Sequence, residues 1–391
     1  MKIAIISPRD PIPIYTGLLE RIYQTANILS KYHEVKLFFP AEPRKKESGR
    51  IPKHINFERI PFSSKWINYF YPKLQAYSNL KAIYNLHLWA YSSLKKKLEI
   101  FSPEVIDIEL PFLYPLTLLC NKKMKVPIVV SEHLIQYLIY NKKSVMNNFL
   151  KKYEIFVLKN ASHIVTVSKA DKEDISKYVS RSKISICPNG VDINYYHPNM
   201  SKYSRDIKKK YGISGPLVVF HGSLIDPPNR VAINVIRNKI LPFISKKYPD
   251  IIFMIIGANP PKINHPNIIF TGLVDNLPAY LAAADVAIDP VLESTGAEIK
   301  ILEYLACGVP TVVSNMAAKG IDLLVDKENV LIADDINKNF SNLIIRVLED
   351  PMLRKEIILN GRKLVEEKYS WEKVISKYEV IFQTVVYKNY F

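Results

Sequence analysis

Residues 296–313 read Gly-Ala-Glu-Ile-Lys-Ile-Leu-Glu-Tyr-Leu-Ala-Cys-Gly-Val-Pro-Thr-Val-Val. The pattern predicts a tight glycine turn, a short helix over 299–306 and a Gly-Val-Pro turn into a buried strand. A helix that begins after a glycine turn offers free backbone N–H groups and the positive end of its dipole, which suits a diphosphate. Glu303 lies one to two turns into this helix, where a carboxylate can accept both hydroxyls of a ribose. The alternative is a helix whose Glu303 only faces solvent.

Short apolar runs alternate with stretches of helical spacing on both sides of this segment. The expected strands are 3–6, 35–39, 104–108, 128–130, 164–167, 183–186, 217–220, 251–256, 267–270, 286–288 and 311–313. The expected helices are 16–31, 230–247, 299–306, 339–349, 352–368 and 371–387. Strands separated by helices indicate βαβ units and parallel sheets, so the predicted fold class is α/β.

The alternation breaks at the loop 188–198 and then starts again. The restart predicts a second doubly wound, Rossmann-like domain. We expect the first domain to be 1–196, joined by a C-terminal helix over 371–391, and the second to be 197–370.

The composition limits the classes of partner. The chain has 391 residues, with 54 Lys and Arg against 37 Asp and Glu, which gives a formal charge of +17. This excess implies an anionic partner, and nucleic acid, an anionic membrane face and a diphosphate substrate all fit. Cys120, Cys187 and Cys307 are far apart, as expected of reduced thiols in a cytoplasmic protein. No apolar run approaches the ~20 residues of a spanning helix, so we expect no integral membrane protein.

Residues 60–98 contain lysines interleaved with aromatic residues and no acidic residue. Aromatic residues among lysines suit a membrane interface, so this segment is a candidate for peripheral contact with an anionic membrane, at its inner face. The same pattern also fits aromatic side chains packed inward beside solvated lysines, and the sequence leaves both interpretations open.

The stretch 296–313 resembles the donor site of glycosyltransferase family 4, the large retaining GT-B family. Further segments similar to pieces of that family occur in the same order, at 165–168, 188–192, 220–229, 255–261, 269–274 and 281–286. Each is weak alone, but together they cover nearly the whole chain. The resemblance implies a GT-B fold, with two Rossmann-like domains and an intervening cleft, the first for the acceptor and the second for the nucleotide-sugar donor.

The resemblance also implies a reaction. The expected enzyme moves a hexose, with retention, from a UDP- or GDP-linked sugar to a lipid-linked or polysaccharide acceptor. Charge builds on the leaving phosphate, so positioned cations and helix amides supply most of the catalysis and no protein nucleophile is needed. No Asp-x-Asp cluster is present, and because Arg and amides can replace a metal, we expect neither metal nor cofactor.

The resemblance implies a set of donor-binding residues, in which Glu303 holds the ribose. The family often has a second glutamate eight residues earlier, but Thr295 stands there, and Glu293 or Glu298 can substitute for it. The other expected donor contacts are Gly17, Gly222, Ser223, Asn229, Thr295, Gly296, Ala297, Glu298 and Ile299.

Gly17 ends the first loop, where this fold places ligand loops and where a glycine permits close approach to a phosphate. The family commonly has two adjacent glycines there, and this chain has one. No Gly-x-Gly-x-x-Gly lies nearby, which argues against a dinucleotide cofactor. Arg21 lies one helical turn further and is expected to face either the cleft or solvent.

Three residues are candidates for catalysis. A basic pair usually clamps the donor diphosphate, but Pro227-Pro-Asn-Arg230 replaces the family's lysine, so Arg230 is the first candidate and Lys300 the second. Lys300 has the alternative of being an exposed helix residue. His133 follows the strand 128–130 and is expected to hydrogen-bond to the transferring sugar or the acceptor, its alternative being a structural role.

Three rival functions stay open. A sugar-nucleotide epimerase or hydrolase has the same fold but needs no acceptor. A non-catalytic sugar-nucleotide-binding homologue fits the unusual Thr295. A nucleic-acid binder is suggested by charge alone, and since no RNA- or DNA-binding motif is present, we expect no nucleic-acid partner.

Overall fold

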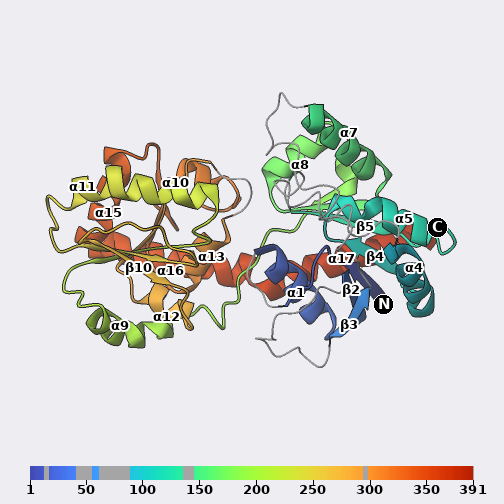
Figure 1. Ribbon diagram of the computed structural model, residues 1–391, viewed down its shortest axis with the longest axis horizontal. Helices are drawn as coiled ribbons and strands as arrows, with labels where there is room; N and C mark the ends of the chain where they lie inside the picture. The colour runs from blue at the N-terminus through green and yellow to red at the C-terminus, as the bar shows by residue number, and fades with distance from the viewer. Residues whose placement is uncertain are drawn as a thin grey trace. The chain divides into compact units, whose positions relative to one another are not determined.

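The computed structural model describes residues 1–12, 17–40, 55–60, 89–133, 135, 145–293 and 298–390. The chain divides into two compact units, Met1–Cys187 with Val374–Phe391, and Pro188–Lys373 (Figure 1). This division gives residues 188–196 to the second unit, whereas the sequence placed the boundary at residue 196. Hydrogen bonds within the second unit explain the assignment, because Arg362 donates to the carbonyls of Ile193 and Tyr196 at 3.2 and 2.9 Å.

The first unit is built on one parallel sheet. Its described strands are β1 Lys2–Ile6, β2 Glu34–Pro40, β3 Asn56–Ile60, β4 Val105–Ile108, β5 Ile128–Glu132, β6 His163–Thr166 and β7 Ile184–Ile186. They lie in the order β3-β2-β1-β4-β5-β6-β7, and all neighbours pair in parallel. The order changes direction between β1 and β4, and ligands bind beyond the carboxyl ends of the strands at such a point.

Helices cover this sheet, which explains why its central strands β1, β4 and β5 are buried almost throughout rather than at alternate residues. The described helices are α1 Gly17–Leu29, α4 Trp89–Phe101, α5 Tyr114–Asn121, α7 Val145–Asn160, α8 Lys169–Ser176 and α17 Trp371–Tyr390, with 3-10 turns at Pro111–Leu113 and Arg181–Lys183. In α1 the buried residues Leu19, Ile22, Ala26 and Leu29 recur at helical spacing. From Val374 onward, α17 belongs to the first unit.

The second unit has its own parallel sheet. Its strands are β8 Leu217–His221, β9 Ile252–Ile256, β10 Ile268–Gly272, β11 Val286–Asp289, β12 Thr311–Ser314 and β13 Leu331–Ala333. The order is β10-β9-β8-β11-β12-β13, and it changes direction between β8 and β11. Both expected sheets are therefore present in the described residues, and the predicted α/β class with two doubly wound parallel sheets is confirmed.

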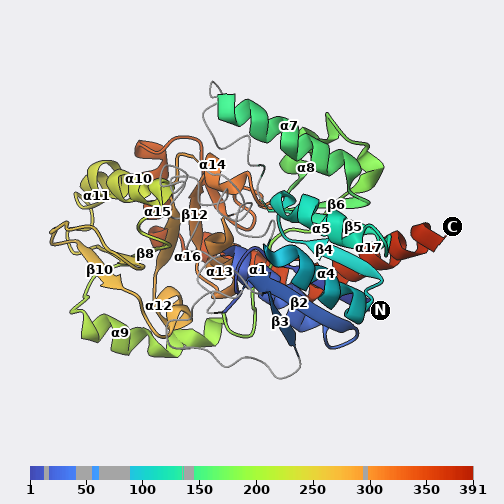
Figure 2. The same ribbon diagram turned by 45° about the vertical axis from the view of Figure 1, so that its right-hand side comes forward.

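Helices lie on both sides of the second sheet, with α10 and α12 on opposite sides (Figures 1 and 2). The helical segments are η4 Pro198–Tyr203, α9 Ser204–Lys210, α10 Pro227–Val235, η5 Ile236–Ile240, α11 Leu241–Ile244, α12 Leu277–Ala282, α13 Ile299–Ala306, α14 Asn315–Ala318, α15 Lys338–Glu349, α16 Pro351–Leu364 and η6 Val365–Tyr369. The expected helix 230–247 begins earlier, because Pro227 is favoured in a first helical turn.

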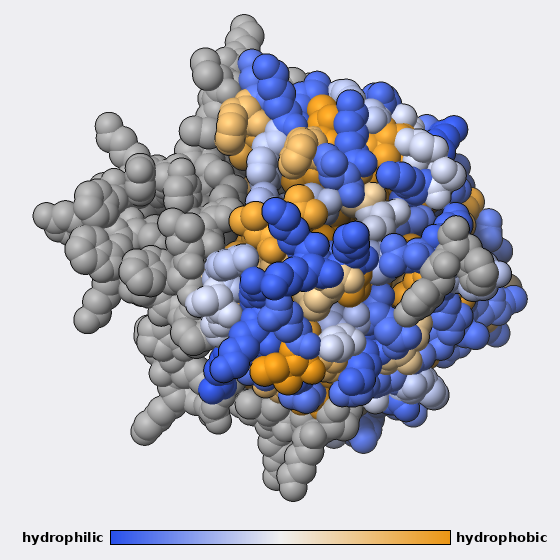
Figure 3. Space-filling model, turned by 90° about the vertical axis from the view of Figure 1, so that its right-hand side faces the viewer, coloured by the Kyte–Doolittle hydropathy of each residue, from blue (hydrophilic) through white to orange (hydrophobic). Residues whose placement is uncertain are grey.

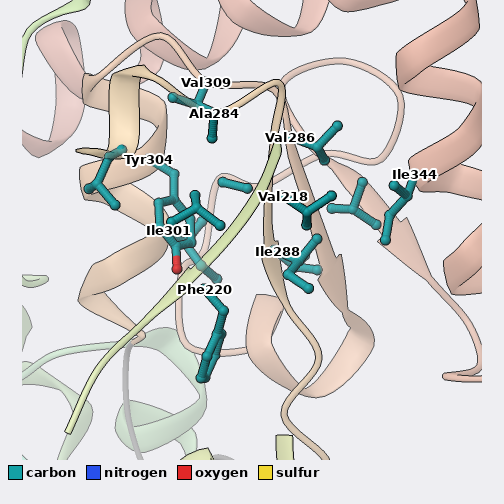
Figure 4. Close-up of a cluster of buried hydrophobic side chains, with 14 of the residues drawn as sticks. Val218, Phe220, Ala284, Val286, Ile288, Ile301, Tyr304, Val309 and Ile344 are labelled. Atoms are coloured by element: carbon teal, nitrogen blue, oxygen red, sulfur yellow. The ribbon is translucent and has the colours of Figure 1, made fainter. Parts of the chain in front are cut away.

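Helix α13 packs against the middle of this sheet, and every residue from Lys300 to Ala306 is buried. Figure 4 shows Ile301 and Tyr304 of α13 among the labelled core side chains, with Val218 and Phe220 of β8 and Val286 and Ile288 of β11. Burial of seven of its eight residues fixes the direction of α13 against β8 and β11. The two polar residues of this buried helix, Lys300 and Glu303, are therefore held at defined positions.

Two strands were not expected from the sequence. Strand β3 is an edge strand of the first sheet, and β13 has only three residues.

On the face of the molecule drawn in Figure 3, hydrophobic residues are interspersed among hydrophilic ones. None of the helices in the described part of the chain combines the length and the apolar character that crossing a bilayer requires.

Candidate active site

Glu303 contacts a histidine from the neighbouring strand β8. Its Oε2 lies 2.8 Å from Nε2 of His221, and both side chains are almost completely enclosed. Tyr304, the residue after Glu303 on α13, holds the histidine in place. The backbone N–H of His221 donates to the Tyr304 hydroxyl at 3.0 Å, and the two rings meet edge to face with centroids 5.2 Å apart. The carboxylate that the sequence assigned to ribose therefore lies at the carboxyl end of β8.

The charge of Glu303 follows from these neighbours. Burial acts to raise the pKa of the Glu303 carboxyl, but His221 and a hydrogen bond from Tyr196 outweigh burial, so that the pKa is lowered. An ionised carboxylate accepts hydrogen bonds at both oxygens, which is what two adjacent hydroxyl donors require.

Lys300 is buried one turn before Glu303, so the alternative of an exposed helix lysine is wrong. Its ammonium donates to Asn229 Oδ1 at 2.8 Å and lies 3.3 Å from Glu298 Oε2 and 3.5 Å from Asp289 Oδ1. Burial acts to lower the pKa of Lys300, but Asp289 and Glu298 raise it above its ordinary value, which keeps the ammonium charged. The Lys300 ammonium can be buried because these three oxygen atoms replace the water that would otherwise surround it.

Asp289, the last residue of β11, is fully buried on the side of Lys300. Burial raises the pKa of the Asp289 carboxyl to about 7, although Lys300 opposes the shift. Oδ2 of Asp289 has no hydrogen-bond partner within the part of the chain that the structure describes.

The loop after β8 joins the same group of residues. Asn229 donates from Nδ2 to the Ser223 carbonyl at 2.9 Å and accepts from Lys300 on Oδ1, so one amide connects the loop to α13. Gly222 lies at φ +153°, and a Cβ there would come within 2.9 Å of Asn229 Nδ2. A side chain at Gly257, after β9, would approach the Gly222 carbonyl to 2.0 Å. The close approach of these two turns therefore requires glycine.

The structure thus brings together five expected residues of the second unit, namely Gly222, Ser223, Asn229, Glu298 and Lys300, with Glu303 one helical turn further along α13. Arg230 is exposed on α10, and its Nε donates to the Leu224 carbonyl at 3.1 Å. Glu298 is the N-cap residue of α13 and Ile299 is its first residue. Thr295, Gly296 and Ala297 lie outside the described residues.

In the first unit, His133 contacts a carboxylate that the sequence analysis did not select. His133 Nε2 lies 2.7 Å from Oε2 of Glu109, whose side chain is completely buried. Glu109 follows β4 and His133 follows β5, and because these parallel neighbours end at the same edge of the sheet, the two side chains meet. Gly17, the remaining candidate of this unit, is the first residue of α1.

Arg21 does not face solvent, so that alternative for it was wrong. It is buried, and its guanidinium donates to the Cys187 carbonyl at 2.7 Å and to the Tyr378 hydroxyl at 2.8 Å. Cys187 directly follows β7 and Tyr378 lies on α17, so Arg21 of α1 joins three distant parts of the first unit. Such long-range pairing leaves no local signal in the sequence.

Three site residues were missed, namely His221, Asp289 and Glu109. Each lies at or directly after the end of an apolar strand, next to the point where the strand order changes direction. A polar residue at the end of an otherwise apolar strand is the signal that could have identified them. In the described residues, no group of three or more His, Cys, Asp or Glu side chains is arranged to hold a metal ion.

Two family models match the chain. Residues 16–195 match the model described as Glycosyltransferase Family 4, and residues 215–350 match the model described as Glycosyl transferases group 1. The matches fall one in each half of the chain and together include α13 and the strand ends described above.

Characterised and uncharacterised relatives share moderate identity. The chain is 29% identical over 243 residues to the Escherichia coli UDP-Gal:alpha-D-GlcNAc-diphosphoundecaprenol alpha-1,3-galactosyltransferase, covering 55% of this chain and 60% of that protein. It is 26% identical over 215 residues to a GDP-mannose-dependent monoacylated alpha-(1-6)-phosphatidylinositol monomannoside mannosyltransferase of Corynebacterium glutamicum, covering 50% and 55%. The uncharacterised glycosyltransferase MJ1069 of Methanocaldococcus jannaschii is 24% identical, with 98% of each chain covered.

Solved structures share the fold over nearly the whole length. HepE of Anabaena in complex with UDP superposes with a TM-score of 0.73 at 14% identity, covering 98% of this chain and 100% of that one. Sucrose-phosphate synthase of Thermosynechococcus elongatus gives a TM-score of 0.75 at 16% identity, covering 98% and 99%. At these identities the likeness concerns the fold.

Proposed function

Because the chain belongs to glycosyltransferase family 4, we propose that it transfers a hexose from a nucleoside-diphosphate sugar to a lipid-linked or polysaccharide acceptor, with retention of configuration. The observation that carries this proposal is the pairing of an ionised carboxylate, Glu303, with a buried ammonium, Lys300, one helical turn apart on α13. These are the two charges that a nucleoside diphosphate needs, one for its ribose hydroxyls and one for its phosphates.

The nucleoside is held through Glu303. Its carboxylate accepts the two ribose hydroxyls, and His221 keeps it ionised. The nucleoside is uridine or guanosine, in line with relatives named for UDP-Gal and for GDP-mannose. Thr295, Gly296 and Ala297 are proposed to contact the donor on the turn before α13, as the sequence suggests.

The leaving diphosphate is stabilised by Lys300 and Arg230. Negative charge grows on the phosphate as the glycosidic bond breaks, and a cation already fixed in place needs no reorganisation at that moment. Asn229 and Asp289 hold Lys300 in this way. Arg230, exposed one residue after Asn229, supplies the second cation, and we propose that no metal or other cofactor is required.

The acceptor is proposed to be lipid-linked or glycan in nature, since several relatives are named for acceptors built on undecaprenol diphosphate or phosphatidylinositol. His133 is proposed to accept a hydrogen bond from a hydroxyl of the transferring sugar or of the acceptor. The cytoplasmic location that the three thiols suggest stays a prediction.

Peripheral contact with an anionic membrane is also proposed, and α7 supports it. Phe149 and Phe156 are 62% and 52% exposed, and at helical spacing Lys152 and Lys159 share their face. Of the expected segment 60–98, residues 61–88 lie outside the described part. In the remainder, Lys97 pairs with Glu58 and Lys95 lies over the Tyr91 ring, which makes this part a poorer candidate.

A donor screen tests the proposed function. We expect UDP or GDP to raise the melting temperature of the full chain more than NAD does, because a ligand that binds only the folded state stabilises it. Incubation of the preferred sugar nucleotide with a membrane lipid extract should then give a glycosylated lipid. Products formed from the donor alone would instead indicate an epimerase or hydrolase, and binding without turnover would indicate a non-catalytic homologue.

A further inference from the structure

The contact between Glu109 and His133 contains a chemical constraint that the proposed function does not use. Glu109 Oε2 lies 2.7 Å from His133 Nε2, and within the described residues this is the hydrogen bond that His133 makes. The Glu109 side chain has no exposed surface, whereas 10% of the His133 side chain is exposed. Glu109 therefore cannot touch a ligand directly and can act only through the imidazole.

The surroundings of the pair are charged and enclosed. The titratable groups that face it are Arg21 of α1, Asp107 of β4 and Tyr378 of α17. Asp107 accepts a hydrogen bond from Ser131 at 2.8 Å. Oε1 of Glu109 and Oδ2 of Asp107 are buried without a hydrogen-bond partner in the described residues. One guanidinium thus faces two enclosed carboxyl groups.

The charge state of the imidazole follows. Burial, reinforced by Arg21, lowers the pKa of His133 well below its ordinary value, so the ring is neutral near pH 7. Burial raises the pKa of Glu109 to about 7, although Arg21 opposes the shift. An ionised carboxylate only accepts, so when Glu109 is ionised the ring proton must lie on Nε2. Nδ1 then carries a lone pair and no hydrogen.

We propose that Glu109 is a positioning residue that sets the tautomer of His133, so that Nδ1 faces the ligand as a hydrogen-bond acceptor for a hydroxyl group. The inference rests on the proposed function for the identity of the hydroxyl, which belongs to the sugar or to the acceptor. The tautomer itself rests only on the contact between the two side chains and on their enclosure.

One added proton puts a hydrogen on Nδ1 of His133, whichever of the two residues takes up the proton. If Glu109 takes the proton, its O–H donates to Nε2 and the ring hydrogen moves to Nδ1. If His133 takes the proton, both ring nitrogens carry hydrogen. In either case Nδ1 becomes a donor and can no longer accept from a hydroxyl, so the pair loses its function as pH falls below about 7.

Nitrogen NMR of the full chain, labelled with ¹⁵N only in the histidine rings, measures this directly. The His133 signals are assigned by their loss in His133→Gln. We expect bare Nδ1 and protonated Nε2 at about pH 8.5, with Nδ1 becoming protonated as pH falls through about 7. In Glu109→Gln, which cannot titrate, this transition should be absent between about pH 8.5 and 6.

An internal control is present in the same unit. His163 of β6 contacts Ser185 Oγ at 2.9 Å, and burial lowers its pKa to about 4, so its signals should stay unchanged over this range in both proteins. A protonated Nδ1 on His133 at pH 8.5 in the wild type would overturn the proposal without need of any variant. An unchanged transition in folded Glu109→Gln would overturn it as well.

The transfer reaction provides a second readout. Wild-type turnover should fall about tenfold per pH unit below pH about 7, and Glu109→Gln should show no such acid limb. A merely structural Glu109 would change the rate at every pH and leave the acid limb in place, which would contradict the proposal. If the chain transfers no sugar, the proposed function fails while the NMR result still decides the tautomer.

Discussion

His221 Nε2 lies 2.8 Å from Glu303 Oε2, so a histidine that ends one strand contacts the carboxylate of a helix far along the chain. This contact keeps Glu303 ionised in a buried position where a lone carboxylate would take up a proton. Replacement of Glu303 by Ala removes the acceptor proposed for both ribose hydroxyls. Loss of hydrogen bonds to a charged group costs about 1.5–3 kcal/mol each, so kcat/KM at low donor concentration should fall at least about tenfold.

A matched control separates this effect from a general loss of charge. Glu356 is an exposed glutamate on α16 of the same unit, and Glu356→Ala should leave kcat/KM for the donor unchanged. Full activity of Glu303→Ala at low donor concentration would remove the ribose assignment.

Lys300 and Arg230 should differ in a measurable way. Lys300→Met leaves Asp289 and Glu298 without their buried partner, and breaking a buried ion pair typically costs about 3–5 kcal/mol. We therefore expect Lys300→Met to lower both the melting temperature and the affinity for UDP or GDP. Arg230→Ala is an exposed change and should alter unfolding by no more than about 0.5 kcal/mol while weakening nucleotide binding.

Calorimetric titration with the nucleotide, beside thermal unfolding, distinguishes these two variants. Lys300→Arg keeps the charge and serves as the conservative variant. If Lys300→Met bound the diphosphate as tightly as the wild type, Lys300 would be a structural ion only.

Asp289 should make stability depend on pH. Its carboxyl keeps its proton in the folded chain up to pH about 7, whereas an unfolded aspartate loses it near pH ~3.9. The folded state therefore binds the extra proton between these values, and this contribution to stability is present below about pH 4 and is lost as pH rises through about 7.

Urea unfolding of the wild type and of Asp289→Asn at several pH values measures this contribution. The free energy of unfolding of Asp289→Asn, relative to the wild type, should rise with pH between about 4 and 7 and level off above. A difference that is constant over that range would mean that the Asp289 carboxyl ionises normally.

The exposed face of α7 should govern binding to vesicles. Phe149→Ser with Phe156→Ser removes two large apolar side chains from a surface that carries Lys152 and Lys159. We expect the double variant to sediment less with vesicles of phosphatidylglycerol and phosphatidylcholine, and the wild type to be released by salt. Val380→Ser, on an exposed position of α17, is the control, and equal sedimentation of all three proteins would exclude α7 as the contact.

Elements that bury a long apolar face could be predicted from the sequence, and α13 begins and ends at the expected residues, Ile299 and Ala306. Strand β13, Leu331–Ala333, is too short to show a recognisable pattern of apolar residues. Strand β3 lies at the edge of its sheet and was also not predicted. In the candidate site, Glu303 was identified from its place in that helix and from the family resemblance, and Lys300 as a candidate for the basic pair that the resemblance implies. Glu109 and Asp289 were not, because their importance depends on which strand ends become neighbours.

The hydrogen bonds of Arg21 have a consequence for synthesis on the ribosome. Tyr378, one of its partners, is translated only after the whole of Pro188–Lys373, although it completes the unit that begins at Met1. The nascent first unit therefore emerges with a guanidinium whose aromatic partner does not yet exist. The buried side chains Ile375 and Phe382 of α17 also arrive only after an entire second fold has left the exit tunnel, which makes this interval the one in which chaperones would matter most.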